Sequence, residues 1–160
     1  MEKDGIKLDP RKVEAMTAWL KPTTMKEVQQ FLGLTNFFRK CILGYADLAA
    51  PMVELTKKDA AWSWANQREL SFQQLKLALT EAPVLAIPDP AAPFELITDS
   101  SGYGLGAVLM QHNRPMAFYS RRMTAAERNY VNHEQGLLAA IIVSLLSRYF
   151  AATCWELSST

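Results

Sequence analysis

The segment EAPVLAIPDPAAP (residues 81–93) constrains the fold of this chain more than any other stretch. Four prolines fall between Pro83 and Pro93, and proline lacks the backbone N–H that helices and sheets use for hydrogen bonds. No long regular element can therefore cross this segment. The chain of 160 residues divides here into an upstream and a downstream part, joined by a linker or an extended covering strip.

Apolar residues upstream of this segment recur at helical spacing. Asp9 and Pro10 predict a helix start before RKVEAMTAW, and Thr24 with Glu27 forms a capping box before VQQFLGLTNFFRKCI. ADLAAPMVELTKK and RELSFQQLKLALTEA predict two shorter helices. Three leucines of the last helix are placed near one face: Leu70, Leu75 and Leu79.

The downstream part has the pattern of strands. FELITDS, GLGAVLMQ and RPMAFYSRR are separated by the turn residues SSGYG and HN, which predicts an antiparallel β-meander. Thr124, with Glu127 three residues later, is expected to open one long helix over TAAERNYVNHEQGLLAAIIVSLLSRYFA. CWELSST is interpreted as the possible start of a fourth strand. The predicted class is α+β.

Composition limits the location and the partners of the chain. The formal net charge is +1, which gives no global reason to expect nucleic acid. Cys41 and Cys154 have no partner at zinc-ligand spacing, which indicates a reducing compartment or two buried thiols. MEKDGIKLDP is no secretion signal, and LLAAIIVSLL is about half as long as a membrane-spanning helix. An intracellular protein without membrane association is expected.

Several stretches, in this order and spacing, make the chain recognisable. They are GIKLDPRKVEAMTAWLKPTTMKEVQQFLGLTNFFRKCI, YADLAAPMVELTKK, SFQQLKLALTEAPVLAIPDP, TDSSGYGLGAVLMQ, RPMAFYSRRMTAAERNY and HEQGLLA. The chain resembles part of the polymerase polyprotein of Gypsy-type LTR retrotransposons. The resemblance implies a reverse-transcriptase thumb-like helical region in residues 1–82, a proline-rich linker in 83–93 and a truncated ribonuclease H-like domain in 94–160. The polymerase palm is absent, so DNA synthesis by this chain alone is not expected.

Ribonuclease H chemistry uses two Mg²⁺ ions about 4 Å apart, held by several carboxylates. The resemblance implies that Asp99 in TDSS is the first ligand and that Gly136 in HEQGLLA stands where the family has a glutamate. Glu134 is a poor substitute, because two residues along a helix turn a side chain by about 200°. The family's third carboxylate falls at or next to Thr160, and its fourth lies further downstream. Asp99 is interpreted as a remnant that binds metal weakly, if at all; the alternative is a strand-end residue that hydrogen-bonds the following turn.

Other side chains suggest contact with nucleic acid. Five basic residues could face a sugar-phosphate backbone or simply be solvated: Lys26, Arg39, Lys40, Arg121 and Arg122. Four aromatic residues are expected in the helical core rather than stacked on bases: Phe37, Phe38, Trp62 and Trp64.

Three functions remain open at this point. The first is an inactive reverse transcriptase/ribonuclease H-like fragment with residual affinity for RNA–DNA hybrid or duplex. The second is a recruited protein-interaction or scaffolding subunit of a larger assembly. The third is a ribonuclease H that another chain completes, the only case in which Mg²⁺ is expected as a cofactor. A protein partner or self-association is expected through residues 136–160, because one small sheet cannot bury all of LLAAIIVSLL.

Overall fold

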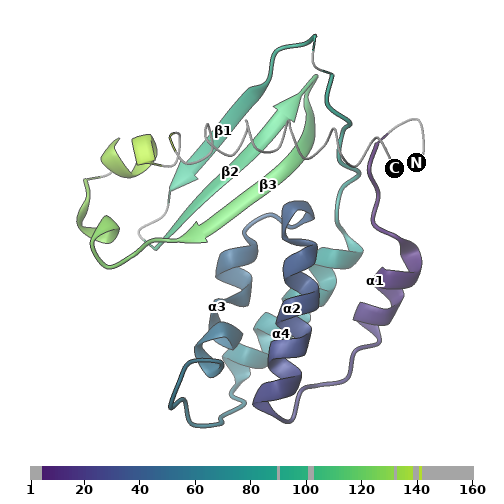
Figure 1. Ribbon diagram of the computed structural model, residues 1–160, viewed down its shortest axis with the longest axis vertical. Coiled ribbons are helices and arrows are strands. Elements are labelled where there is room, and N and C mark those ends of the chain that lie inside the picture. Colours follow the sequence, from purple (N-terminus) through teal and green to yellow (C-terminus); the bar gives the residue numbers. More distant parts are fainter. Residues whose placement is uncertain (1–4, 90, 101–102, 132, 139–140, 142–160) are drawn as a thin grey trace. The chain divides into compact units, whose positions relative to one another are not determined.

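The computed structural model describes residues 5–89, 91–100, 103–131, 133–138 and 141 (Figure 1). Their contacts divide the chain into two compact units. One is the helical unit, Leu8–Ala82; the other, the sheet unit, combines residues 5–7 with the described residues from Pro83 onward. Residues 5–7, which the sequence assigned to the helical region, therefore group with the sheet. Within the described ranges, every helix is too short or too polar to span a bilayer.

The helical unit begins two of its helices at the predicted caps. The Asp9 side chain accepts a hydrogen bond from the Arg11 N–H at 2.9 Å, and the Thr24 hydroxyl accepts from the Glu27 N–H at 3.3 Å. The Glu27 carboxylate accepts from the Thr23 N–H at 2.7 Å, so the return bond of the capping box reaches one residue earlier than usual. The elements are α1 (Pro10–Thr17), α2 (Met25–Phe37), the 3-10 helix η1 (Arg39–Cys41), α3 (Tyr45–Leu55) and α4 (Asn66–Thr80).

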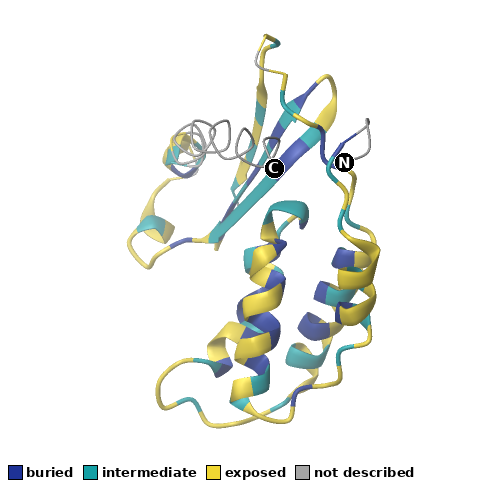
Figure 2. Cartoon of the chain, turned by 45° about the vertical axis from the view of Figure 1, so that its right-hand side comes forward, coloured by how far each residue is buried: buried dark blue, intermediate teal, exposed yellow. Residues whose placement is uncertain are grey.

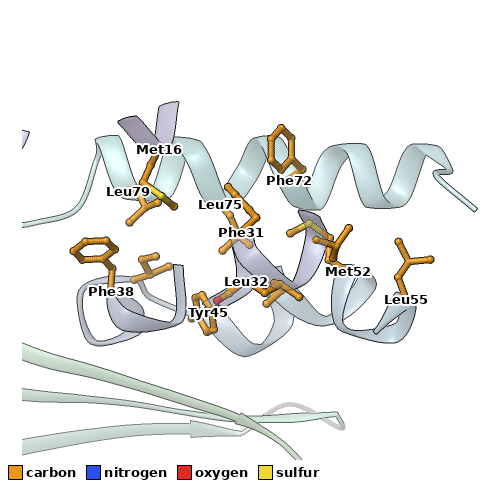
Figure 3. Packing of buried hydrophobic residues seen from close by; sticks show 13 residues of the cluster. Met16, Phe31, Leu32, Phe38, Tyr45, Met52, Leu55, Phe72, Leu75 and Leu79 are labelled. Carbon is orange, nitrogen blue, oxygen red and sulfur yellow. Dashed lines mark hydrogen bonds between the residues drawn. The ribbon is translucent and has the colours of Figure 1, made fainter. Parts of the chain in front are cut away.

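Aromatic packing forms the centre of the helical unit (Figure 3). The ring of Phe31 on α2 lies 4.6 Å from that of Phe72 on α4 and 6.0 Å from that of Trp19. Burial of each such side chain contributes about 1.5–3 kcal/mol to folding. Residues of all four helices complete the cluster, among them Met16, Val28, Leu32, Ala49, Met52, Leu55, Leu75 and Leu79.

Three residues expected in this core lie instead at the surface. Leu70 is 60% exposed, Phe37 is 72% exposed and Trp62 is 41% exposed. Leu70 precedes the buried Leu75 by five positions, so the two side chains are about 140° apart around the helix. Phe37 follows the buried Thr35 by two positions, so these side chains are about 200° apart. In Figure 2 the outer sides of these helices are exposed. The predictions for Leu70 and Phe37 were wrong because they relied on the apolar character of these residues and not on their angular position around the helix.

The sheet unit contains the predicted meander. β1 (Glu95–Ser100), β2 (Gly104–Gln111) and β3 (Arg114–Arg122) form an antiparallel sheet in the order β1-β2-β3, which confirms the α+β class. His112 and Asn113 join β2 to β3 with φ values of 51° and 59°. Two positive φ values in a two-residue loop are typical of a type I′ hairpin turn.

The proline-rich strip is held to the sheet unit by side-chain and backbone bonds. The buried Gln111 amide accepts from the Asp89 N–H at 2.8 Å and donates to the carbonyls of Asp89 and Ala92 at 2.8 and 3.0 Å. Leu85 exchanges two backbone hydrogen bonds with Ile6, at 2.7 and 2.9 Å. Since an unsatisfied buried amide costs about 1–3 kcal/mol, these bonds explain why a polar residue is tolerated here.

The pair Thr124 and Glu127 does not open the long helix. Its two capping bonds are present: the Thr124 N–H donates to the Glu127 carboxylate at 2.8 Å, and the Glu127 N–H donates to the Thr124 hydroxyl at 3.4 Å. They start only a short 3-10 turn, η2 (Glu127–Asn129). The predicted start of the long helix is therefore wrong.

The next α-helical residues that the structure describes are 133–138, beyond η2. Tyr130 has extended backbone angles, with φ −70° and ψ 145°. The Gln135 side chain donates to the Tyr130 carbonyl at 2.9 Å, and such a side chain to backbone bond competes with continued helix. Residues 142–160, which hold the rest of the predicted helix and the possible fourth strand, lie outside the described residues.

Glu69 connects three segments of the helical unit. Its carboxylate accepts from Trp64 Nε1 at 2.7 Å and from Gln73 Nε2 at 3.0 Å, and lies 3.2 Å from Lys21 Nζ. These partners, above all Gln73 and then Trp64, lower the pKa of Glu69 to about 2. The carboxylate thus ties the segments before α2 and before α4 to the first turns of α4.

Replacing Glu69 with Gln is expected to destabilise the helical unit by about 1 kcal/mol at pH 7, because two hydrogen bonds lose their charged acceptor and a partly exposed ion pair is lost. The folded-state pKa of about 2 lies below the ordinary 4.5. The contribution is therefore present above pH 4.5 and is lost as pH falls toward 2. Urea unfolding of wild type and Glu69→Gln at pH 7 and pH 3 measures it, with the exposed Glu81→Gln as control. A difference that stays constant at pH 3 would contradict this account.

Candidate nucleic-acid interface and metal position

Asp99 is the carboxylate that the sequence proposed as a metal ligand. It occupies the fifth position of the six-residue strand β1 and is exposed. Its partner across the sheet is Gly106 of β2, so the directly opposite position contributes no side chain. A lone carboxylate on a strand can hold a hard divalent cation only weakly, because Mg²⁺ and Ca²⁺ sites draw on several oxygen ligands.

Gly136 lies among the described α-helical residues 133–138 and is half-buried. Outside its own helix backbone and chain neighbours, no described atom lies within 4 Å of the place that its Cβ would occupy, so the described packing does not require glycine at this position. Glu134 serves the start of the helix instead: its carboxylate accepts from the Val131 N–H at 3.2 Å. The side chain that could have replaced the missing ligand is thus engaged with its own backbone.

The described part of the chain holds no group of three or more His, Cys, Asp and Glu side chains that could bind a metal ion. Thr160, the third position derived from the resemblance, lies outside the described residues. Two Mg²⁺ ions held close together require several converging carboxylates. Asp99 would supply one of them.

The outer side of α2 is a feature that the sequence prediction missed. Four exposed residues repeat at spacings of four, three and four, and we refer to them as the α2 strip: Lys26, Gln30, Gly33 and Phe37. They lie opposite the buried side of the helix, which carries Val28, Phe31, Leu32 and Thr35. Gly33 costs about 1 kcal/mol of helix propensity relative to alanine, and nothing lies within 4 Å of its Cβ position. The signal was the spacing itself, which was overlooked because Phe37 was assigned to the core.

Cations lie at both ends of the α2 strip. Lys26 is in the first turn of α2, where the helix dipole disfavours a positive charge, and Arg39 follows the helix in η1. Lys12 of α1 places its Nζ 5.6 Å from the ring centre of Phe37. Since α2 is about 20 Å long at 1.5 Å per residue, Lys26 and Lys12 flank an elongated surface. The predicted Arg39 instead interacts with Tyr45, which bonds Thr35 on the buried side of α2. Lys40 is half-buried beside Arg39.

Arg121 and Arg122 end β3 in the sheet unit, so they belong to a different unit from the α2 strip. The Arg121 guanidinium holds both oxygens of Glu127, at 2.9 and 3.0 Å. This bidentate pair raises the pKa of Arg121 and lowers that of Glu127 to about 2, the Arg121 hydrogen bond being the largest cause. A phosphate would have to compete with Glu127 for Arg121.

Comparison with known proteins places this geometry in context. Residues 64–152 match the family described as the RNase H-like domain found in reverse transcriptase. The chain is 39% identical over 148 residues to the retrovirus-related Pol polyprotein from transposon 297 of Drosophila melanogaster, covering 92% of this chain and 14% of that protein. It is 35% identical over 153 residues to the polyprotein from transposon gypsy of the same organism, covering 88% and 15%. The chain thus spans only about one seventh of the length of these relatives.

Solved structures of foamy viral protease-reverse transcriptase share the fold. One is a complex with double-stranded DNA, with a TM-score of 0.83 and 21% identity over 92% of this chain and 27% of that chain. Another is a complex with an RNA/DNA hybrid, with a TM-score of 0.79 and 21% identity over 89% of this chain and 20% of that chain.

Substituting Arg121 with Lys is expected to raise the pKa of Glu127 from about 2 toward its ordinary 4.5, because an ammonium group cannot reproduce the two parallel bonds of a guanidinium. Side-chain carboxyl shifts followed by NMR during an acid titration report this pKa. Arg128→Lys provides the control, since Arg128 lies over the Tyr103 ring instead. An unchanged Glu127 titration in Arg121→Lys would show that the ion pair is absent in solution.

Proposed function

Because the chain belongs to the RNase H-like family found in reverse transcriptases, we propose that this retroelement polyprotein fragment binds a nucleic-acid duplex and has no nuclease activity of its own. The α2 strip is the observation that carries the binding proposal. It is exposed, it has a flat centre at Gly33, and cations lie at both of its ends. Foamy viral proteins of the same fold are described in complexes with double-stranded DNA and with an RNA/DNA hybrid, which supports a duplex as the ligand.

The dimensions of the α2 strip fit the backbone of a duplex. A strip about 20 Å long spans about six base-pair steps along the axis of a duplex at 3.4 Å each. Lys26 and Lys12 would contact phosphates, while Gly33 would let the helix approach the sugar edges closely. Gln30 and Phe37 would add a hydrogen bond and an aromatic contact. Such contacts position a duplex without reading its sequence.

Fluorescence anisotropy with a labelled RNA–DNA hybrid and a DNA duplex of equal length tests the interface. Lys26→Gln is expected to weaken binding of both about fivefold and to lower the slope of log K against log salt by about 0.9, because one phosphate contact is lost. Gly33→Leu is expected to weaken binding by at least as much without destabilising the fold, since nothing packs against that position.

The matched control is Lys58→Gln, which removes an exposed lysine between α3 and α4 and should leave affinity unchanged. Equal affinity of wild type, Lys26→Gln and Gly33→Leu would remove the α2 strip from the interface. Circular dichroism of each variant separates loss of contact from loss of fold.

The absence of nuclease activity rests on the chemistry of the ligand positions. Asp99 stands on β1 and Gly136 stands where the resembling family carries a glutamate, so the metal pair would lack a second carboxylate. With one ligand, the site cannot offset the repulsion between two divalent cations. The described part of the chain offers no replacement cluster.

A hybrid-cleavage assay in Mg²⁺ and in Mn²⁺ tests this assignment. Wild type and Gly136→Glu are both expected to show no metal-dependent cleavage above background, although the position can accept the larger side chain. Restoring one carboxylate still leaves too few ligands for two cations. Cleavage by wild type that disappears in Asp99→Asn would overturn the inactive assignment and would mean that another chain supplies the missing carboxylates.

A further inference from the structure

A second surface of the helical unit exposes leucines in a regular pattern. On α4, Leu70 and Leu77 are 60% and 55% exposed, although leucine is usually buried. They are seven positions apart, and Gln74 lies between them at spacings of four and three. The three residues therefore form one line along the helix, and we refer to them as the α4 ridge.

A hollow of about 490 Å³ lies beside the α4 ridge, between α3 and α4. Leu70 belongs both to the α4 ridge and to the lining of the hollow. Further apolar residues in the wall of the hollow are Leu43, Leu48 and Pro51. The Ser71 hydroxyl, which lies in the wall of the hollow, already has a hydrogen-bond partner because it donates to the Leu48 carbonyl. The volume falls within the range of sites that bind small ligands or anchoring side chains.

The polar groups of this hollow can accept hydrogen bonds from a cation. Asp47, in the first turn of α3, contributes an exposed carboxylate. Its backbone carbonyl also lacks the usual helical donor four residues later, because that residue is Pro51. The described lining contains no lysine or arginine, although Arg68 Nε donates to the carbonyl of the lining residue Pro51 at 3.4 Å. Continuing the spacing of the α4 ridge by four positions reaches another acid, Glu81.

We propose that the α4 ridge and the adjoining hollow bind an amphipathic helix of a partner protein that carries lysine or arginine beside its apolar face. The ridge leucines are two helical turns apart, which matches the i and i+7 anchors of a partner helix lying alongside α4. The cation of the partner would meet Asp47. A second copy of this chain fits less well, because pairing this surface with itself would bring acidic side chains next to acidic side chains.

A pair of synthetic helical peptides provides the probe. Both carry leucines at i, i+3 and i+7; one has lysines beside the apolar face, and the other has glutamates at the same places. Anisotropy titration with the full chain is expected to show at least tenfold tighter binding of the lysine peptide. Leu70→Gln should weaken that binding about tenfold, and Asp47→Asn should reduce the preference between the peptides to less than threefold.

Leu20→Gln is the matched control, since Leu20 is exposed before α2 and belongs neither to the α4 ridge nor to the lining of the hollow, and it should change nothing. The duplex variant Lys26→Gln should bind the lysine peptide normally, which separates this surface from the α2 strip. Equal binding of both peptides, or a lysine peptide insensitive to Leu70→Gln, would refute the proposal. A concentration-dependent dimer in sedimentation that Leu70→Gln abolishes would also overturn it, by assigning the surface to a second copy.

Discussion

The contact between Phe31 and Phe72 determines which surfaces the helical unit can offer. The two rings lie 4.6 Å apart at the centre of the core, and they join α2 to α4. Successive side chains are about 100° apart around a helix. This contact therefore also determines which residues of both helices face outward. The exposure of the α2 strip and of the α4 ridge therefore follows from this one contact in the core.

The two surfaces differ in chemistry although they belong to one small unit. The α2 strip has Lys26 at one end, Lys12 over the Phe37 ring at the other and a glycine at its centre, which are features suited to a polyanion. The α4 ridge combines leucines with Asp47 and Glu81, as a basic amphipathic helix requires. The two proposed ligands, a duplex and a partner helix, would therefore contact different helices, which a net charge of +1 does not reveal.

In the sheet unit, the carboxylates that form hydrogen bonds hold the backbone and side chains of the protein itself. Glu127 holds Arg121 and the turn after β3, and Glu134 holds the start of the helix. Asp99 faces Gly106 across the sheet. The carboxylates of Glu127 and Glu134 therefore stabilise the local structure.

Local signals in the sequence were sufficient where a short-range interaction decides the structure. Asp9, Thr24 and the HN turn predicted helix starts and a hairpin that are present, and all three strands were placed within a residue of their bounds. Thr124 misled the prediction, because its capping bonds are satisfied equally by a single 3-10 turn. Local bonds identify where a turn begins but not how far a helix continues.

The sequence by itself determined the division at the prolines, the element types and the single carboxylate at Asp99, since these depend on backbone chemistry and residue identity. Only the tertiary structure decided which apolar side chains are inside. Leu70 and Leu75 have identical chemistry, and Phe37 and Phe38 are adjacent, yet one of each pair is exposed and the other buried. Burial depends on the direction from which a neighbouring helix packs, and that direction is set by contacts between residues far apart in the chain.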